Sequence, residues 1–141
     1  MANAIASIDW RFASAPSLVD FESMAQEAWN NLPAEFRALA GDVIIRIEDF
    51  ATDEILDELD IEDPYDLTGI YLGVSLDKQS VSDAPREPEM VFLYRRAILD
   101  EWASSDEELG HLIAHVLIHE IGHHFGFSDD DMEAVEAETT A

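Results

Sequence analysis

Cysteine is absent from the 141 residues, and lysine and arginine together number only 7, against 32 aspartates and glutamates. Without cysteine, disulfide frameworks, thiolate zinc sites and thiol catalysis are excluded. The formal net charge of −25 opposes binding to nucleic acid or to an anionic membrane, because both are polyanions. We therefore expect neither as a partner. The simplest interpretation of the acidity is a solvated surface. The alternatives are steering of cationic peptides or metal ions into a negative cleft, and mimicry of a polyanion.

Long hydrophobic runs are also missing, and the N-terminus lacks the pattern of a secretory signal. No apolar stretch approaches the ~18–20 residues of a transmembrane helix. Asp9 and Arg11 interrupt the apolar patch near the N-terminus, so we expect no secretory signal and, by elimination, a cytoplasmic location. The length and a hydrophobic content of 48% suit one compact domain. We expect an N-terminal arm over residues 1–16 and a single domain over 17–141.

The first two thirds of the chain carry local signals for short elements. Ser17 is expected to cap a helix that runs to Trp29, and Pro33 to begin a short helix that Gly41 ends. The remaining expectations are strands at 43–47, 67–74 and 90–94, an amphipathic helix at 53–63 and a surface loop at 77–89.

A strongly apolar helix is expected from Ser105 to about Phe125, because Ser105 and Glu108 have capping-box spacing. Its apolar residues occupy nearly all faces, which is typical of a helix in the middle of a protein. Gly126 would end it, and an acidic helix is expected over 129–138. The order of helices, a few strands and then helices indicates an α+β domain.

This apolar helix contains all five histidines of the chain. His119 and His123 are four residues apart, so their side chains project from the same face and can bind one ion. Neutral imidazole nitrogen is a common ligand of zinc. Glu120 completes the pattern H-E-x-x-H, in which this carboxylate acts as general base on water at the metal rather than as a ligand.

A catalytic zinc site usually has three protein ligands and one open position. Asp129 is the expected third ligand, because Gly126 allows the positive-φ turn that brings the chain back toward the metal. The acidic residues that could replace it as ligand are Asp130, Asp131, Glu133 and Glu136.

Other polar residues have simpler expected roles. His115 lies four residues before His119 and makes a second candidate metal pair, although an exposed or supporting position is the simpler expectation. His124 is expected to pack in the core or to support a ligand. The hydroxyl groups that could stabilise an oxyanion are those of Tyr71 and Tyr94.

The alternative to a metal site is an ordinary buried helix. That helix would have to bury His119, Glu120 and His123 on one apolar element and give each polar group a partner. A metal ion and its water would supply those partners together. The pattern therefore favours a metal site.

Residues 119–129 read H-E-x-x-H-x-x-G-x-x-D, which resembles the signature of the Asp-zincins. The chain also resembles the small bacterial zincin-like metallopeptidase family, formerly a domain of unknown function, over most of residues 20–135. Individually weaker similarities are "IEDF" at 47–50, "LTGIYLGVSL" at 67–76 and "VFLYRRAI" at 91–98. The resemblance implies a minimal zincin-like fold over residues 17–141, with a buried active-site helix beside a small, mostly antiparallel or mixed sheet.

The same resemblance implies a Zn2+-dependent metallopeptidase. His119, His123 and Asp129 look like the zinc ligands, and Glu120 looks like the general base. The expected substrates are peptides or unfolded protein segments. The alternative is a module without turnover that binds a metal or, through its acidic surface, another protein.

Overall fold

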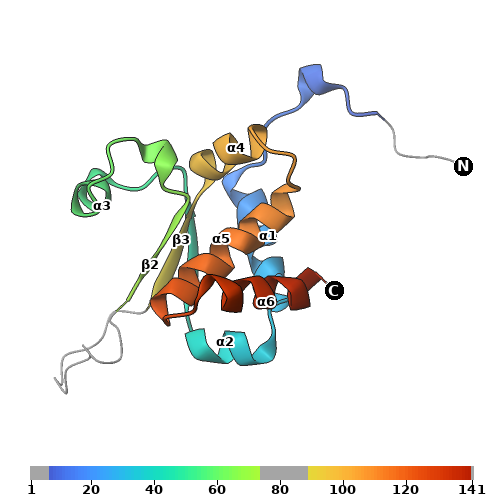
Figure 1. Ribbon diagram of the computed structural model, residues 1–141. Helices are drawn as coiled ribbons and strands as arrows, with labels where there is room; N and C mark the ends of the chain where they lie inside the picture. Colours follow the sequence, from blue (N-terminus) through green and yellow to red (C-terminus); the bar gives the residue numbers. More distant parts are fainter. Residues whose placement is uncertain (1–6, 74–88, 141) are drawn as a thin grey trace, which may run out of the picture.

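The computed structural model describes residues 7–73 and 89–140, which form helices around a three-stranded mixed sheet (Figure 1). This arrangement confirms the expected α+β class. In chain order the elements are η1 (Trp10–Phe12), α1 (Leu18–Asn30), α2 (Ala34–Ala40), β1 (Ile44–Glu48), α3 (Asp53–Glu58), η2 (Pro64–Asp66), β2 (Gly69–Leu72), β3 (Met90–Tyr94), α4 (Arg95–Ala103), α5 (Leu109–His124) and α6 (Asp129–Thr140).

The central strand of the sheet is β3, which pairs in parallel with β1 and antiparallel with β2. Val91 and Leu93 face the main core, whereas Phe92 and Tyr94 belong to a smaller cluster that also contains Leu56. Burial on both faces explains why β3 is apolar throughout. The mixed sheet agrees with the expectation.

The helix that carries the H-E-x-x-H pattern is α5, and it lies across the sheet (Figure 1). It contacts α1, α4, α6, β2 and β3. The buried α5 residues are Leu112, Ile113, Val116, Leu117, Ile118, Ile121 and Gly122. Contacts on several sides explain the nearly continuous apolar surface that the sequence shows.

Helix ends follow local chemistry in most places. Ser17 and Asp20 form a capping box at the start of α1, and Gly41 follows α2 with a φ of 63°. The helix expected over 53–63 is shorter, because Asp60 has a left-handed φ of 59° that a helix cannot continue through.

The expected capping box of Ser105 and Glu108 is wrong. The helix begins at Leu109, and Glu108 makes no side-chain cap hydrogen bond. Residues 95–103 form α4, which the sequence analysis did not predict, and the Ser105 hydroxyl donates to the Trp102 carbonyl at the end of α4. Ser105 therefore belongs to the end of one helix rather than to the start of the next.

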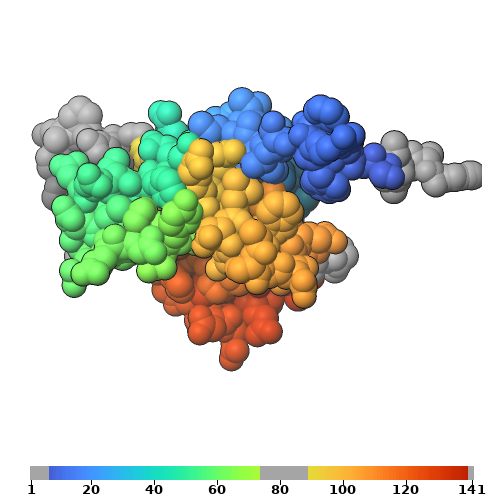
Figure 2. Space-filling view, turned by 90° about the horizontal axis from the view of Figure 1, so that it is seen from above, coloured from blue at the N-terminus to red at the C-terminus, as the bar shows by residue number. Residues whose placement is uncertain are grey.

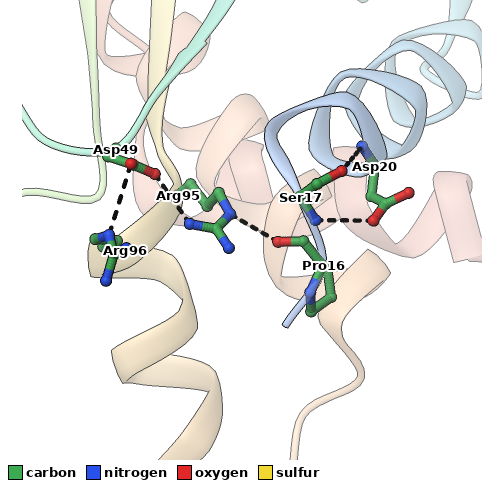
Figure 3. A network of polar contacts seen from close by, with 6 residues as sticks. All are labelled: Pro16, Ser17, Asp20, Asp49, Arg95 and Arg96. Atoms are coloured by element: carbon green, nitrogen blue, oxygen red, sulfur yellow. Dashed lines mark hydrogen bonds and ion pairs between the residues drawn. The ribbon is translucent and has the colours of Figure 1, made fainter. Parts of the chain in front are cut away.

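The described part of the N-terminal segment, residues 7–16, extends away from the body (Figures 1 and 2). Trp10 is 73% exposed and Phe12 81% exposed. The segment is held at its end, because Nε of Arg95 donates to the Pro16 carbonyl at 2.6 Å (Figure 3). Arg95 also forms an ion pair of 3.0 Å with Asp49.

The surface loop expected over 77–89 falls outside the described residues, apart from Glu89. None of the helices in the described ranges has the length and apolar character that a membrane crossing requires.

Candidate metal centre

The two histidines of the H-E-x-x-H pattern lie one turn apart on α5, as their spacing predicts. The ring centroids of His119 and His123 are 5.6 Å apart, and the rings are nearly perpendicular, at 89°. His119 is half-buried and His123 is exposed. Both histidines are therefore near enough to contribute to a single site at the C-terminal end of the helix.

Glu120 lies half-buried where α5 packs on the sheet. Burial raises the pKa of its carboxyl group to about 7, because the charged form loses contact with water. A carboxyl group with this pKa exchanges its proton readily near neutral pH, which is the property that a general acid–base residue needs.

Asp129 begins α6, one short turn after α5, and is exposed. Gly126 makes that turn with a φ of 78°, so the predicted positive-φ reversal is present. Asp131 takes part in the helix start, where its carboxylate accepts from the Ser128 backbone N–H at 3.1 Å. This bond lowers the pKa of Asp131 and gives the residue a capping role.

The tightest group of candidate ligands is formed by His115, His119 and Glu136. One ligand atom from each of them lies within 4.8 Å of the others, and no other such group occurs among the described residues. His119 and Asp129 therefore do not belong to a comparably tight group with His123. The ring centroids of His115 and His119 are 4.0 Å apart, and His115 Nδ1 contacts Oε1 of Glu136.

The electrostatic surroundings of His119 include residues from both sets. Burial lowers the pKa of His119 first, and the neighbouring imidazoles of His115 and His123 lower it further. Glu136 and Asp129 act in the opposite direction. A histidine with a lowered pKa is neutral at physiological pH, and the neutral form is the one that binds a metal.

His124 packs against β2, as expected of a residue that supports the helix. Its ring stacks on Tyr71 with a centroid distance of 3.9 Å, and the Tyr71 hydroxyl donates to Glu89 at 2.6 Å. Glu89 was not singled out in the sequence, because a single glutamate at the edge of a loop carries no distinguishing signal. The three residues fasten the C-terminal end of α5 to the sheet.

The two candidate oxyanion hydroxyls differ in access. Tyr71 is half-buried with its hydroxyl bound to Glu89, whereas Tyr94 is only 1% exposed. The Tyr94 hydroxyl has no hydrogen-bond partner among the described residues, and burial raises its pKa to about 12. Its burial puts Tyr94 out of reach of a substrate.

A cavity of about 980 Å3 lies between α1, α5 and α6. His115 and Glu136 line it, so the tight group of candidate ligands opens onto this space. No lysine or arginine occurs among the described residues that line it. The acidic residues in its wall are Glu27, Glu101, Glu107, Glu133 and Glu136.

Comparison with known proteins gives one family. A sequence model of the zincin-like metallopeptidases matches residues 40–139, which include the sheet, α5 and all but the last residue of α6. A search of curated proteins finds no match. The matched segment covers more than half of the chain and contains the whole H-E-x-x-H pattern. The chain therefore belongs to the zincin-like metallopeptidase family.

Proposed function

We propose that this protein is a zinc-dependent peptidase, with His119, His123 and Asp129 as the metal ligands and Glu120 as the general base. The observation that supports the proposal best is the arrangement of α5 and α6. Two imidazoles lie one turn apart on α5 with ring centroids at 5.6 Å, and a glycine turn with a φ of 78° leads directly to Asp129.

The residues fit a zinc ion chemically. Two imidazole nitrogens and one carboxylate oxygen are a donor set that zinc peptidases use. Asp129 lies near enough to His119 to influence its pKa, and burial favours the neutral, metal-binding form of that histidine. When bound, zinc would supply Lewis acidity that polarises a peptide carbonyl and makes water a better nucleophile at neutral pH.

Glu120 would move the proton. It accepts a proton from the attacking water as the new C–O bond forms, and it delivers that proton to the amine nitrogen as the C–N bond breaks. The carboxyl pKa of about 7 suits both halves of this transfer. Glu120 is not counted among the ligands, because in the H-E-x-x-H pattern this carboxylate acts on the water at the metal rather than on the metal itself.

The substrates that fit best are peptides or unfolded segments with basic residues. The cavity beside His115 and Glu136 has five glutamates and, among its described lining residues, no lysine or arginine. Such a wall attracts cationic chains and repels acidic ones. Cleavage of a basic peptide should therefore slow as ionic strength rises, because salt screens this attraction.

The decisive comparison is between the wild-type protein and Glu120→Gln. We expect both to bind zinc, and we expect peptide cleavage by the variant to fall by about 100-fold or more. Glu138→Gln, an exposed glutamate of α6 outside the cavity wall, is the matched control and should retain full activity. Equal cleavage by wild type and Glu120→Gln would contradict the proposal.

A second candidate function is a metal-binding module without turnover. It is favoured by the close group of His115, His119 and Glu136, which needs no substrate to explain it. Stoichiometric zinc without hydrolysis of any peptide in a broad library would support this function over the first.

A further inference from the structure

We propose that His115, His119 and Glu136 form a second metal-binding position, one helical turn toward the start of α5 from the His119–His123 pair, and that it binds a transition-metal ion such as Zn2+. One ligand atom of each residue lies within 4.8 Å of the other two. Ligand atoms around a tetrahedral zinc ion are about 3.3 Å apart, given metal–ligand distances near 2.0–2.1 Å. Small side-chain rotations would close the difference.

The three side chains already face one another. His115 Nδ1 contacts a Glu136 carboxylate oxygen, and the imidazoles of His115 and His119 lie 4.0 Å apart at an angle of 35°. Two imidazole nitrogens and one carboxylate oxygen suit zinc and other ions that favour nitrogen ligands. Because His115 and Glu136 line the cavity, an ion can enter and water can complete its coordination.

The scaffold that holds the group is well packed. His115 and His119 share one face of α5, and Glu136 comes from α6. The two helices meet where Met132 is fully buried, and Gly122 permits the contact, since a Cβ at Gly122 would lie 2.6 Å from the Met132 sulfur. Glu136 follows Met132 by one turn, so the same face of α6 points at α5.

The second position shares His119 with the H-E-x-x-H pair. An ion bound by His115, His119 and Glu136 would occupy His119 and so compete with the catalytic ion for this ligand. This consequence, unlike the binding itself, rests on the proposed peptidase function. Excess zinc should then reduce cleavage, and His115→Ala combined with Glu136→Gln should relieve that inhibition.

Zinc binding can be tested without any activity. The variant His123→Ala with Asp129→Asn removes the two ligands of the proposed catalytic site that the second position does not share, and it leaves the second position intact. After chelator treatment and dialysis, calorimetric titration with Zn2+ alone should show one equivalent bound. Adding His115→Ala and Glu136→Gln should weaken the affinity by about 100-fold, because even residues that only support a ligand commonly contribute 10–100-fold.

Matched controls in the same background are His111→Ala and Glu138→Gln, exposed residues of α5 and α6 that should leave the affinity unchanged. Circular dichroism establishes that each variant is folded. If the folded variant without His123 and Asp129 binds no zinc, or if removing His115 and Glu136 changes nothing, the second position does not exist.

Nuclear magnetic resonance of the wild-type protein with 15N-labelled histidine gives a result that does not depend on a variant folding. Zinc should move the ring signals of His115, and unmoved signals at saturating zinc would overturn the proposal.

The second metal position and the peptidase function can be refuted independently of each other. Zinc binding without His123 and Asp129 alongside an inactive wild type would leave this site standing and end the peptidase proposal. If the wild type cleaves peptides but the variant without His123 and Asp129 binds no zinc, the peptidase proposal stands and the second position is refuted.

Discussion

Gly69 of β2 lies directly beneath Glu120 of α5, so that a methyl group at position 69 would come within 3.3 Å of the Glu120 Cγ atom. The same methyl group would lie 2.9 Å from a Val116 methyl carbon and 2.9 Å from the Phe92 carbonyl oxygen. The missing side chain thus allows α5 to approach the sheet closely. That approach determines how deeply Glu120 is buried, and burial is what raises its carboxyl pKa.

We expect Gly69→Ala to lower the free energy of unfolding by about 1–3 kcal/mol, because the backbone oxygen of Phe92 cannot move aside as a side chain can. The measurement is urea denaturation of the metal-free protein. Gly110→Ala is the control, since its added methyl group would meet nothing within 4 Å beyond the adjacent residues and backbone of its own helix, and it should leave stability unchanged or raise it by up to about 1 kcal/mol. Equal changes in the free energy of unfolding for the two substitutions would contradict the close approach of α5 to the sheet at Gly69.

The pKa of Glu120 also predicts how stability depends on pH. The carboxyl pKa is raised from 4.5 to about 7, so between these values the folded state binds more protons than the unfolded state. This group therefore makes stability decrease as pH rises from about 4.5 to about 7. In Glu120→Gln that part of the decrease should vanish. Denaturation of both metal-free proteins across this range tests it, and parallel stability curves would show that Glu120 has an ordinary pKa.

Short-range signals predicted much of this fold. The capping residue Ser17 and the turn glycines Gly41 and Gly126 act within a few residues of their own positions, and all three behave as expected. The helical spacing of His119 and His123 is equally local. Elements defined by such signals could be predicted from the sequence alone.

Long-range contacts could not be predicted in the same way. His115 and Glu136 were each weighed as single candidates, but their contact depends on the angle at which α6 packs on α5. The start of α5 was misplaced because Ser105, a good capping residue, closes the unpredicted α4 instead. The cytoplasmic location, the exclusion of nucleic acid and membranes, and the roles of His119, Glu120, His123 and Asp129 stay predictions.

Gly126 should matter for metal binding as well as for stability. Its φ of 78° is strained for alanine, so Gly126→Ala should cost about 1 kcal/mol and displace the start of α6, which carries Asp129. We expect weaker zinc binding by calorimetry. Gly41→Ala is the matched control, because Gly41 has a φ of 63° but ends α2 instead. It should also destabilise the protein but leave the zinc affinity unchanged. Equal zinc affinities of the two variants would show that the Gly126 turn does not position a zinc ligand.

Two adjacent arginines of α4 should differ in their contribution to stability (Figure 3). The Arg95 side chain is 14% exposed and bonds to both Asp49 and the Pro16 carbonyl, whereas the Arg96 side chain is 54% exposed and lies 3.6 Å from Asp49. Hydrogen bonds of a partly buried charge contribute about 1.5–3 kcal/mol, and an exposed ion pair contributes about 0–1 kcal/mol.

Arg95→Ala should therefore destabilise the protein by about 1.5–3 kcal/mol and speed proteolysis within residues 7–16, because the bond that holds Pro16 is lost. Arg96→Ala should change stability by less than about 1 kcal/mol and leave proteolysis unchanged. Arg95→Lys should fall between them, since an ammonium group lacks the planar geometry that reaches both partners at once. Urea denaturation and limited proteolysis measure these effects. A larger loss from Arg96→Ala than from Arg95→Ala would contradict the assignment of Arg95 as the arginine that holds residues 7–16 to the body.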